Sequence, residues 1–524
     1  MRPLSIAALL LFPVMAHATE QWTSAEQSGS QCSALTKADF YNIQDAPTQI
    51  LEAGLVTPGK SNVPYCLVAG YVAPQVGFEL KLPESNWNGK LVAVGNAGWG
   101  GGIDSSACDA HVRSGYACVA SDTGHKGTGI EAFWARDNLA AQVDFGFRSV
   151  HVVLLAAKAI VNQYYSKKVS RSYFVGCSTG GYEGLVEAQR FPWDFDGIIA
   201  GAPDMDEADL TMREIWGSRN FLDHNGQPLF TKEHIQLLHN AVLAACDKDD
   251  GVVDGIISNP TACRFDPAKL LCKGNGHPGC LSQEQVEAVR RIYSGPPIPG
   301  DPTHVRGALP GSELNWSALA SIGPSLGEGL FRHMIYGTTP EWTPANYDFA
   351  HDYKRLGLGA LYTDTNPDLR KFKATGGKLL VYQGWNDIVE MPTAIVDYYE
   401  TVERTMGGRD STQQFFRLFM IPGMNHCGGG SGAYAIDYLR YLESWVELGT
   451  APTAMLGGHI NDSYLEALPE GSERPVVDLS RPNEGAPTIP LTFTRPVYPF
   501  PSYAKYKGKG DPNDAKNFVP VNTP

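Results

Sequence analysis

The run GCSTG at positions 176–180 carries the pattern Gly-x-Ser-x-Gly, which is typical of the nucleophile turn of serine hydrolases. The apolar run SYFV precedes it and the helix-like segment GGYEGLVEAQR follows it. Small neighbours allow the tight strand-to-helix turn that exposes such a serine. A second match surrounds Ser325, but it follows Pro324 and no strand-like run. We therefore predict Ser178 as the nucleophile and interpret Ser325 as a loop serine.

A serine hydroxyl needs a base, and the base needs an orienting carboxylate. His426 lies in MIPGMNHCGGG, directly after a strand-like run, and Asp387 lies in QGWNDIVEMP after the run KLLVY. The chain order Ser, Asp, His is the order found in α/β-hydrolases. These positions predict a Ser178–Asp387–His426 triad for acyl transfer.

Two cysteines flank the predicted nucleophile and base. Cys177 directly precedes Ser178, and Cys427 directly follows His426. A disulfide between them would tie the histidine loop to the nucleophile turn and hold both groups within reach of each other. The alternative is a pair of unrelated buried thiols.

Backbone N–H groups must stabilise the oxyanion that forms during acyl transfer. The amide of Thr179, next to the nucleophile, is one candidate. The second is expected from the glycine-rich stretch GNAGWGGG at 95–102, near Gly98, with Ala97 as the alternative.

An acidic loop at 246–256 packs four aspartates into eight positions. Such clustering indicates either a solvated acidic turn or a cation site, and calcium takes six to eight oxygen ligands. The oxygens that could bind calcium belong to three carboxylates and two backbone carbonyls: Asp247, Asp250, Asp254, Val252 and Ile256. Cys246 and Cys263 bracket this loop and could clamp it.

The strands that position the predicted catalytic groups are expected at short apolar runs of the sequence. They lie at 90–94, 116–120, 173–175, 195–200, 378–382 and 415–421, and a helical pattern covers 140–165. Strands alternating with helices predict an α/β fold with a parallel sheet covered on both faces. We expect a catalytic domain at 19–203 and 371–524, with an inserted lid at 204–370. The tail from Ser480 should wrap the surface without a core of its own.

Composition restricts the class of protein. The chain has 524 residues, a formal charge of −14 and ten cysteines without a CxxC pair, so nucleic acid is a poor partner and a structural zinc site is not expected. Residues 1–18 have the layout of a secretory signal, and no later apolar run is long enough for a membrane anchor. A secreted or periplasmic protein with five disulfides is predicted.

Taken together, these segments resemble the tannase/feruloyl esterase family. The matching runs are GNAGWGGGID (95–104), GCSTGGYEGL (176–185), FDGIIAGAP (195–203), CDKDDGVVDGIISNP (246–260), GWNDIVEMP (384–392) and GMNHC (423–427). The resemblance implies an α/β-hydrolase core with an inserted lid, the triad above beside a Cys177–Cys427 bond, and structural calcium at the acidic loop.

The same resemblance implies lid disulfides Cys246–Cys263 and Cys272–Cys280. A C-terminal disulfide that is frequent in the family should be missing, because Tyr498 occupies the place of its first cysteine. The other four cysteines allow three pairings, of which we expect Cys32–Cys66 with Cys108–Cys118.

The resemblance also implies a small-molecule substrate, an ester of an aromatic acid such as ferulate, gallate or terephthalate, hydrolysed through an acyl-enzyme. We predict five residues of the expected lid as candidate substrate contacts: Trp316, Phe331, Arg332, Tyr336 and Trp342. An exported lipase or carboxylesterase for aliphatic esters is the alternative enzyme. A calcium-stabilised binding protein on an inactive hydrolase scaffold is the alternative outside the enzymes.

Overall fold

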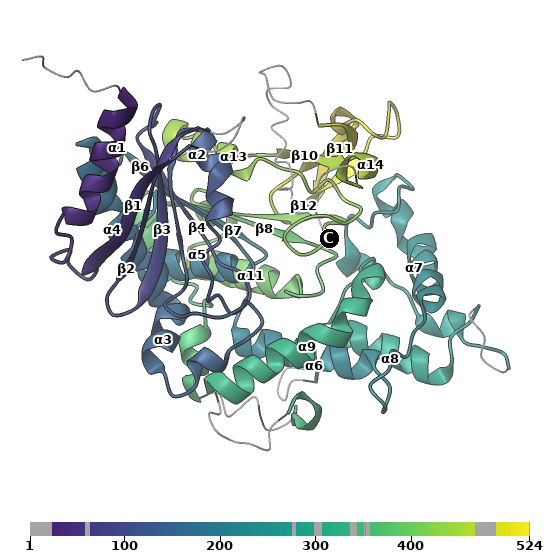
Figure 1. Cartoon of the computed structure of the whole chain (residues 1–524). Coiled ribbons are helices and arrows are strands. Elements are labelled where there is room, and N and C mark those ends of the chain that lie inside the picture. Colours follow the sequence, from purple (N-terminus) through teal and green to yellow (C-terminus); the bar gives the residue numbers. More distant parts are fainter. Residues whose placement is uncertain are drawn as a thin grey trace, which may run out of the picture.

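The computed structural model describes residues 24–57, 63–274, 279–297, 307–335, 343–349, 352, 357–466 and 489–522. The predicted signal segment 1–18 and the proposed contacts Tyr336 and Trp342 lie outside these residues. A nine-stranded sheet with the order β1-β2-β3-β5-β4-β6-β7-β8-β9 forms the centre of the molecule, and a layer of helices lies below it in the view of Figure 1.

Six neighbouring strands of this sheet are parallel, and they fall on the apolar runs predicted from the sequence. They are β5 (Ala117–Ser121), β4 (Lys90–Val94), β6 (Arg171–Cys177), β7 (Gly197–Gly201), β8 (Lys378–Gly384) and β9 (Phe416–Ile421). The residues of β4, β5, β7 and β8 are nearly all buried because helices cover both faces, whereas β6 is buried only over Ser172–Phe174. The carboxyl ends of parallel strands lie at one edge, and the loops after them meet there.

The sheet is extended by an antiparallel meander, which the short apolar runs of the sequence did not predict. It consists of β1 (Thr48–Val56), β2 (Tyr65–Val72) and β3 (Val76–Pro83), and β3 pairs antiparallel with β5. In β2 buried and half-buried residues alternate, as expected for a strand with one covered face. The sheet is therefore mixed, not purely parallel as expected.

Helices cover both faces of the sheet. On one face α4 (Ser149–Tyr165), α5 (Thr179–Arg190) and α11 (Thr393–Thr405) contribute apolar residues to the largest core cluster, and on the other α13 (Tyr438–Leu448) packs into a second cluster. The long helix expected at 140–165 is interrupted by a π-helical segment, Asp144–Arg148, between α3 (Leu139–Val143) and α4. The shorter helices are α1 (Ser24–Ala34), α2 (Asp109–Arg113), α10 (Arg370–Thr375), α12 (Arg409–Thr412) and α14 (Asp462–Glu466).

The chain between β7 and β8 forms the helical layer that Figure 1 shows at the bottom and right. It contains α6 (Glu207–Phe221), α7 (Lys232–Cys246), α8 (Gln283–Ser294) and α9 (Leu319–Gly327). Capping boxes start α7 at Thr231 and α8 at Ser282. Many residues of this layer form a separate apolar cluster around Trp316. Because this segment packs on its own cluster, the alternation of strands and helices stops at this point of the sequence.

The C-terminal segment adds two small antiparallel pairs. β10 (Met455–Ile460) pairs with β11 (Leu491–Val497), and β12 (Ser502–Tyr506) pairs with β13 (Phe518–Asn522). Val497 belongs to a core cluster that also contains Ile421 of β9, and the Phe500 N–H donates to the Leu418 carbonyl at 2.8 Å. The tail therefore wraps the edge strand β9 and shares the core of the sheet.

Five disulfides connect all ten cysteines, in the pairings expected above. They are Cys32–Cys66, Cys108–Cys118, Cys177–Cys427, Cys246–Cys263 and Cys272–Cys280. No helix of the described ranges is long and apolar enough to cross a bilayer.

Candidate active site

Ser178 lies between the end of β6 and the first turn of α5. Its backbone has φ 64° and ψ −129°, a conformation that a non-glycine residue adopts only under constraint and that is typical of a nucleophile turn. A Cβ on Gly176 would lie 2.4 Å from the Gly180 carbonyl oxygen, and one on Gly181 would lie 2.2 Å from the Gly201 oxygen. The small residues of this motif are thus required by the close approach of the neighbouring backbone.

His426 and Asp387 meet at the same edge of the sheet. His426 Nδ1 lies 2.9 Å from Asp387 Oδ2, and Asp387 is fully buried. Burial would raise the pKa of Asp387, but the charge and hydrogen bond of His426 and the N–H groups of Val389 and Glu390 lower it below its ordinary value. Burial would lower the pKa of His426, whereas Asp387 and the charge of Asp204 raise it. The pair is arranged as a histidine base held by a carboxylate.

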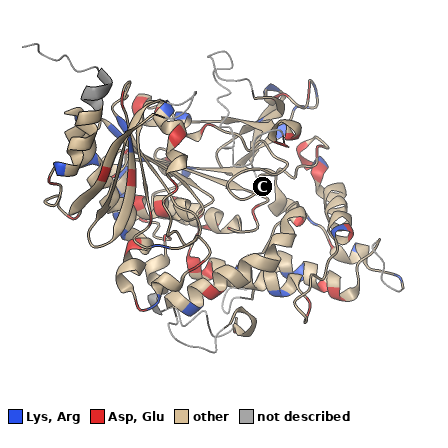
Figure 2. Cartoon of the chain, viewed as in Figure 1, with Lys and Arg blue, Asp and Glu red and all other residues tan. Residues whose placement is uncertain are grey.

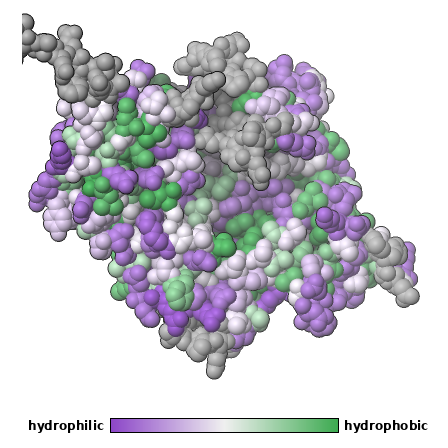
Figure 3. Space-filling view, in the orientation of Figure 1, coloured by the Kyte–Doolittle hydropathy of each residue, from purple (hydrophilic) through white to green (hydrophobic). Residues whose placement is uncertain are grey.

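The Cys177–Cys427 disulfide connects the nucleophile turn to the histidine loop. The two cysteines are 250 residues apart in sequence, and their Cα atoms lie 5.9 Å apart. Ser178 and His426 both line a cavity of about 990 Å³, whose other walls include Tyr382, Val175 and the glycine-rich loop. In Figure 3, apolar residues gather near the centre of the face between the sheet and the helical layer.

The glycine-rich loop after β4 is fixed against the nucleophile turn. Gly180 N–H donates to the Asn96 carbonyl at 2.8 Å, and the Thr179 hydroxyl donates to the Gly98 carbonyl at 2.6 Å. Glu183 of α5 accepts hydrogen bonds from the Asn96 N–H and from its side-chain amide, both at 2.9 Å. Thr179 and Gly98, the two predicted oxyanion donors, are therefore brought together.

The sequence did not single out three buried acids that lie near the triad: Glu183, Asp204 and Glu390. Burial raises the pKa of Glu183 to about 7, although Asn96 counteracts the effect. Glu183 lies in α5, which also carries Glu187 and Arg190, so its sequence position gave no sign of burial. Asp204 and Glu390 lie in loops, where acidic residues are usually assigned to the surface.

The acidic loop lies at the end of α7 and shows as a red segment in Figure 2. Asp247 and Asp250 are buried, and burial raises the pKa of Asp250 to about 6. A cavity of about 20 Å³ is lined by Asp250, Asp254 and Ile256, among others, and has room for one water-sized sphere.

Two of the predicted ligands, Asp247 and Val252, do not line this cavity, whose other walls are mostly apolar. Asp254 is already paired with Arg495 at 2.6 Å. Within the described part of the chain, no three His, Cys, Asp or Glu side chains are placed to hold a metal ion together. A calcium site here would need the carbonyls of Val252 and Ile256 as well, and it stays a prediction.

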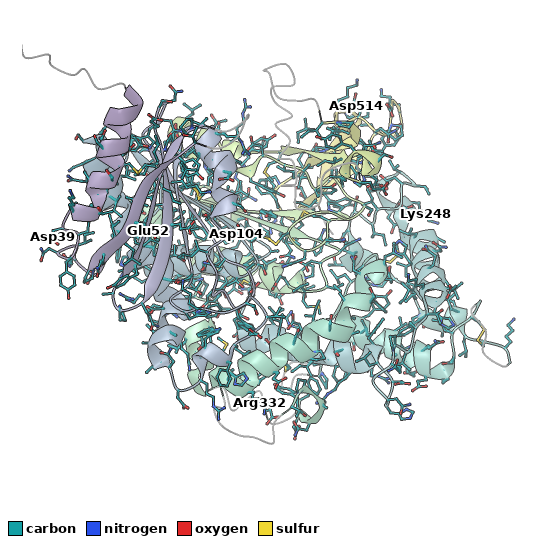
Figure 4. The ribbon with its side chains drawn as sticks, in the orientation of Figure 1. Asp39, Glu52, Asp104, Lys248, Arg332 and Asp514 are labelled. Carbon is teal, nitrogen blue, oxygen red and sulfur yellow. A yellow bond between two sulfur atoms is a disulfide. The ribbon has the colours of Figure 1, made fainter. Side chains whose placement is uncertain are left out.

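Three of the residues offered as substrate contacts, Trp316, Phe331 and Arg332, do not line the cavity of Ser178 and His426. Trp316 is buried in the lid core and donates to the Ser312 hydroxyl, and Phe331 is buried in another apolar cluster. Arg332 pairs with Glu328; Figure 4 shows it low in the helical layer, whereas Asp104, which lines the cavity, lies near the centre of the view.

Ser325, expected in a loop, lies instead in α9. Its hydroxyl donates to the Ser321 carbonyl of the same helix at 2.8 Å. A serine whose hydroxyl is used by its own helix is not presented to a substrate.

Comparison with known proteins decides the family. The family model described as "Tannase and feruloyl esterase" matches residues 61–328 and 338–521. The chain belongs to this family. Mono(2-hydroxyethyl) terephthalate hydrolase from Piscinibacter sakaiensis is 31% identical, over 89% of this chain and 87% of that protein. A probable feruloyl esterase B-2 from Aspergillus flavus is 33% identical, over 78% and 82% respectively.

Among solved structures, feruloyl esterase B from Aspergillus oryzae superposes with a TM-score of 0.81 and 25% identity, covering 94% of this chain and all of that one. The architecture is that of an α/β-hydrolase, and the protein is a carboxylic ester hydrolase.

Proposed function

We propose that the protein is a secreted serine esterase that hydrolyses esters of aromatic acids through an acyl-enzyme. The single observation that carries the serine mechanism is the pairing of His426 with Asp387 at 2.9 Å, with Ser178 tied to the same loop through the Cys177–Cys427 disulfide. Family members named for feruloyl and terephthalate esters support the aromatic acyl group.

In the proposed mechanism Ser178 Oγ attacks the ester carbonyl carbon while His426 Nε2 takes its proton. Asp387 keeps Nδ1–H oriented and stabilises the imidazolium. The N–H groups of Thr179 and Gly98 stabilise the oxyanion. His426 then protonates the leaving alcohol. Water attacks the acyl carbon while His426 takes one of its protons, and His426 returns that proton to Ser178 Oγ as the acid leaves.

Two structural proposals accompany this function. The insertion between β7 and β8 acts as a lid, which its separate apolar core supports. Export to an oxidising compartment is supported by five disulfides and by the signal-like residues 1–18.

The test is hydrolysis of methyl ferulate, methyl gallate, mono(2-hydroxyethyl) terephthalate and p-nitrophenyl acetate by the wild-type chain and by Ser178→Ala. We expect hydrolysis of at least one aromatic ester and its loss in the variant. Full activity of Ser178→Ala would refute the serine mechanism. Hydrolysis of p-nitrophenyl acetate alone would favour the aliphatic alternative.

A further inference from the structure

A buried carboxyl outside the triad lies beside the nucleophile turn. Asp204 follows β7, and its Oδ2 lies 3.0 Å from the Thr179 hydroxyl, whose single proton it shares with the Gly98 carbonyl at 2.6 Å. The Ser178 hydroxyl and the imidazole of His426 also stabilise its ionised form. Only 6% of Asp204 is exposed. Asp204 therefore contacts Thr179 and lies within the electrostatic reach of Ser178 and of the base.

A second carboxyl faces the histidine from another loop. Glu390 lies three residues after Asp387, is 3% exposed, and has Oε1 3.9 Å from His426 Nε2. Its carboxyl lies close enough to that of Asp204 for a side-chain hydrogen bond between them. Asp204 Oδ1 and Glu390 Oε2 are buried and have no other hydrogen-bond partner. Because two carboxylates cannot hydrogen-bond to each other, this pair is satisfied only when one carboxyl is protonated.

The proton belongs on Glu390. Burial, together with the charge and hydrogen bond of Asp204, raises the pKa of Glu390 well above its ordinary value. Burial also raises the pKa of Asp204, but the donors around it oppose this effect.

The other acids around Asp204 are held neutral in the same way. Glu207 of α6 shares a hydrogen bond with Asp204, and Glu214 lies deeper on the same helix. Burial raises their pKa values and that of Asp364 well above the ordinary range, and raises that of Glu183 to about 7. Near neutral pH, Asp204 and Asp387 are therefore the main negative charges that His426 meets.

We propose that Asp204 and Glu390 share one proton and act together as positioning residues for His426 and the nucleophile turn. This inference rests on the proposed serine mechanism. Asp204 holds Thr179 of that turn, and the single negative charge of the pair stabilises the imidazolium that forms when Ser178 gives up its proton. Glu390 supplies the proton that makes two adjacent buried carboxyls compatible.

The experiment measures the pH dependence of kcat/KM on a cleaved aromatic ester for Asp204→Asn, Glu390→Gln and the double variant. The acidic limb of this pH profile is the range in which kcat/KM falls because His426 becomes protonated. Glutamine mimics protonated Glu390, so Glu390→Gln should leave the acidic limb at its wild-type pH. The double variant removes the charge, which lowers the pKa of His426. The base then stays neutral to lower pH, and the acidic limb should move down by about one pH unit.

Asp204→Asn alone transfers the charge to Glu390, since the asparagine amide can donate to it. We expect the acidic limb to stay near its wild-type position, because the pair still carries one charge, and kcat to stay within about threefold of the wild type, because the asparagine oxygen still accepts the hydrogen bond of the neighbouring hydroxyl. An acidic limb that moves down in Glu390→Gln alone would refute proton sharing. An acidic limb that moves down in Asp204→Asn alone would refute the transfer of the charge to Glu390.

Glu187→Gln is the matched control. Glu187 is also buried in α5 and shares a hydrogen bond with an aspartate, Asp194, but this pair lies at the opposite end of the helix from Ser178. The control should change the melting temperature without moving the acidic limb. If the double variant does not fold, the two single variants decide. Failure of the serine mechanism itself would be separate, because Ser178→Ala would then remain active.

Discussion

At the scale of single residues, the site depends on positions where only a small or a buried side chain fits. Gly98 has φ +54°, and a Cβ there would lie 2.1 Å from the Gly129 carbonyl oxygen. The loop that we propose as an oxyanion donor therefore cannot accept a side chain at Gly98 without moving.

We predict that Gly98→Ala lowers kcat/KM about a hundredfold, because the displaced loop withdraws an oxyanion donor. Steady-state kinetics on an aromatic ester measures the effect. Gly54→Ala in β1 is the control, since a Cβ at this exposed glycine meets no atom within 4 Å and the residue does not line the cavity. Equal activities of the two variants would contradict the role of Gly98.

The histidine–carboxylate pair leads to a second prediction at this scale. Asp387→Asn preserves the shape of the side chain but removes the charge that raises the pKa of His426. We expect kcat to fall by about 10⁴-fold, because the imidazole loses its orientation and its counter-charge. Residual activity within tenfold of the wild type would show that another group orients His426.

At the scale of elements, two loops from distant parts of the chain are joined beside the reacting groups. Cys177 ends β6, and Cys427 follows β9 with φ 59°. The chain-entropy model predicts that a bond closing 250 residues stabilises the fold by about 5.5 kcal/mol. The same model gives about 2.5 kcal/mol for the eight-residue Cys272–Cys280 loop.

We predict that the double variant Cys177→Ala/Cys427→Ala unfolds at lower temperature and has a lower kcat. The double variant Cys272→Ala/Cys280→Ala should lose less stability and keep its kcat, because its bond lies in the lid. Thermal melts and kinetics compare the two. A wild-type kcat in the first variant would show that loop packing alone holds Ser178 and His426 together.

The acidic loop is a second element with a measurable property. If calcium binds at Asp247, Asp250 and Asp254, a chelator should lower the melting temperature, and added calcium should restore it. Asp250→Asn should abolish the difference. A melting temperature that does not respond to the chelator would count against the site and favour the structural role that the Asp254–Arg495 pair already provides.

At the scale of the whole molecule, the folded chain buries many acids in neutral form. Glu187, Glu207, Glu214, Asp364 and Glu390 all have pKa values raised well above the ordinary range, primarily by burial. The folded state therefore binds more protons than the unfolded state between the ordinary carboxyl pKa and the raised values.

The raised pKa values determine the direction in which the free energy of unfolding changes with pH. The stabilisation that these protons provide is complete below the carboxyl pKa of the unfolded chain, about 4.5. It is lost as the pH rises through the raised pKa values of the folded state, about 7 for Glu183. We predict a lower melting temperature at pH 8.5 than at pH 5.5, at constant salt and calcium. Glu183→Gln should reduce the difference. A melting temperature that rises over this interval would contradict the prediction.

Much of this architecture could be predicted from the sequence because its signals are local. The six parallel strands coincide with short apolar runs, and the triad follows from a motif, a chain order and two flanking cysteines. The meander β1–β3 has weaker alternation and was missed. Asp204 and Glu390 could not be predicted from the sequence. They lie in loops separated by 186 residues, and no local sequence pattern indicates that two such loops meet. The lid contacts were misplaced because Trp316 and Phe331 serve the lid's own core.

The Cys177–Cys427 bond also determines when, after synthesis, the active site can be completed. The nucleophile turn is synthesised well before its partner loop, and the bond between them needs an oxidant. A chain still in a reducing compartment can carry every residue of the triad and still lack the link that fixes their separation. The enzyme would then be latent where it is made and mature only where its thiols can be oxidised.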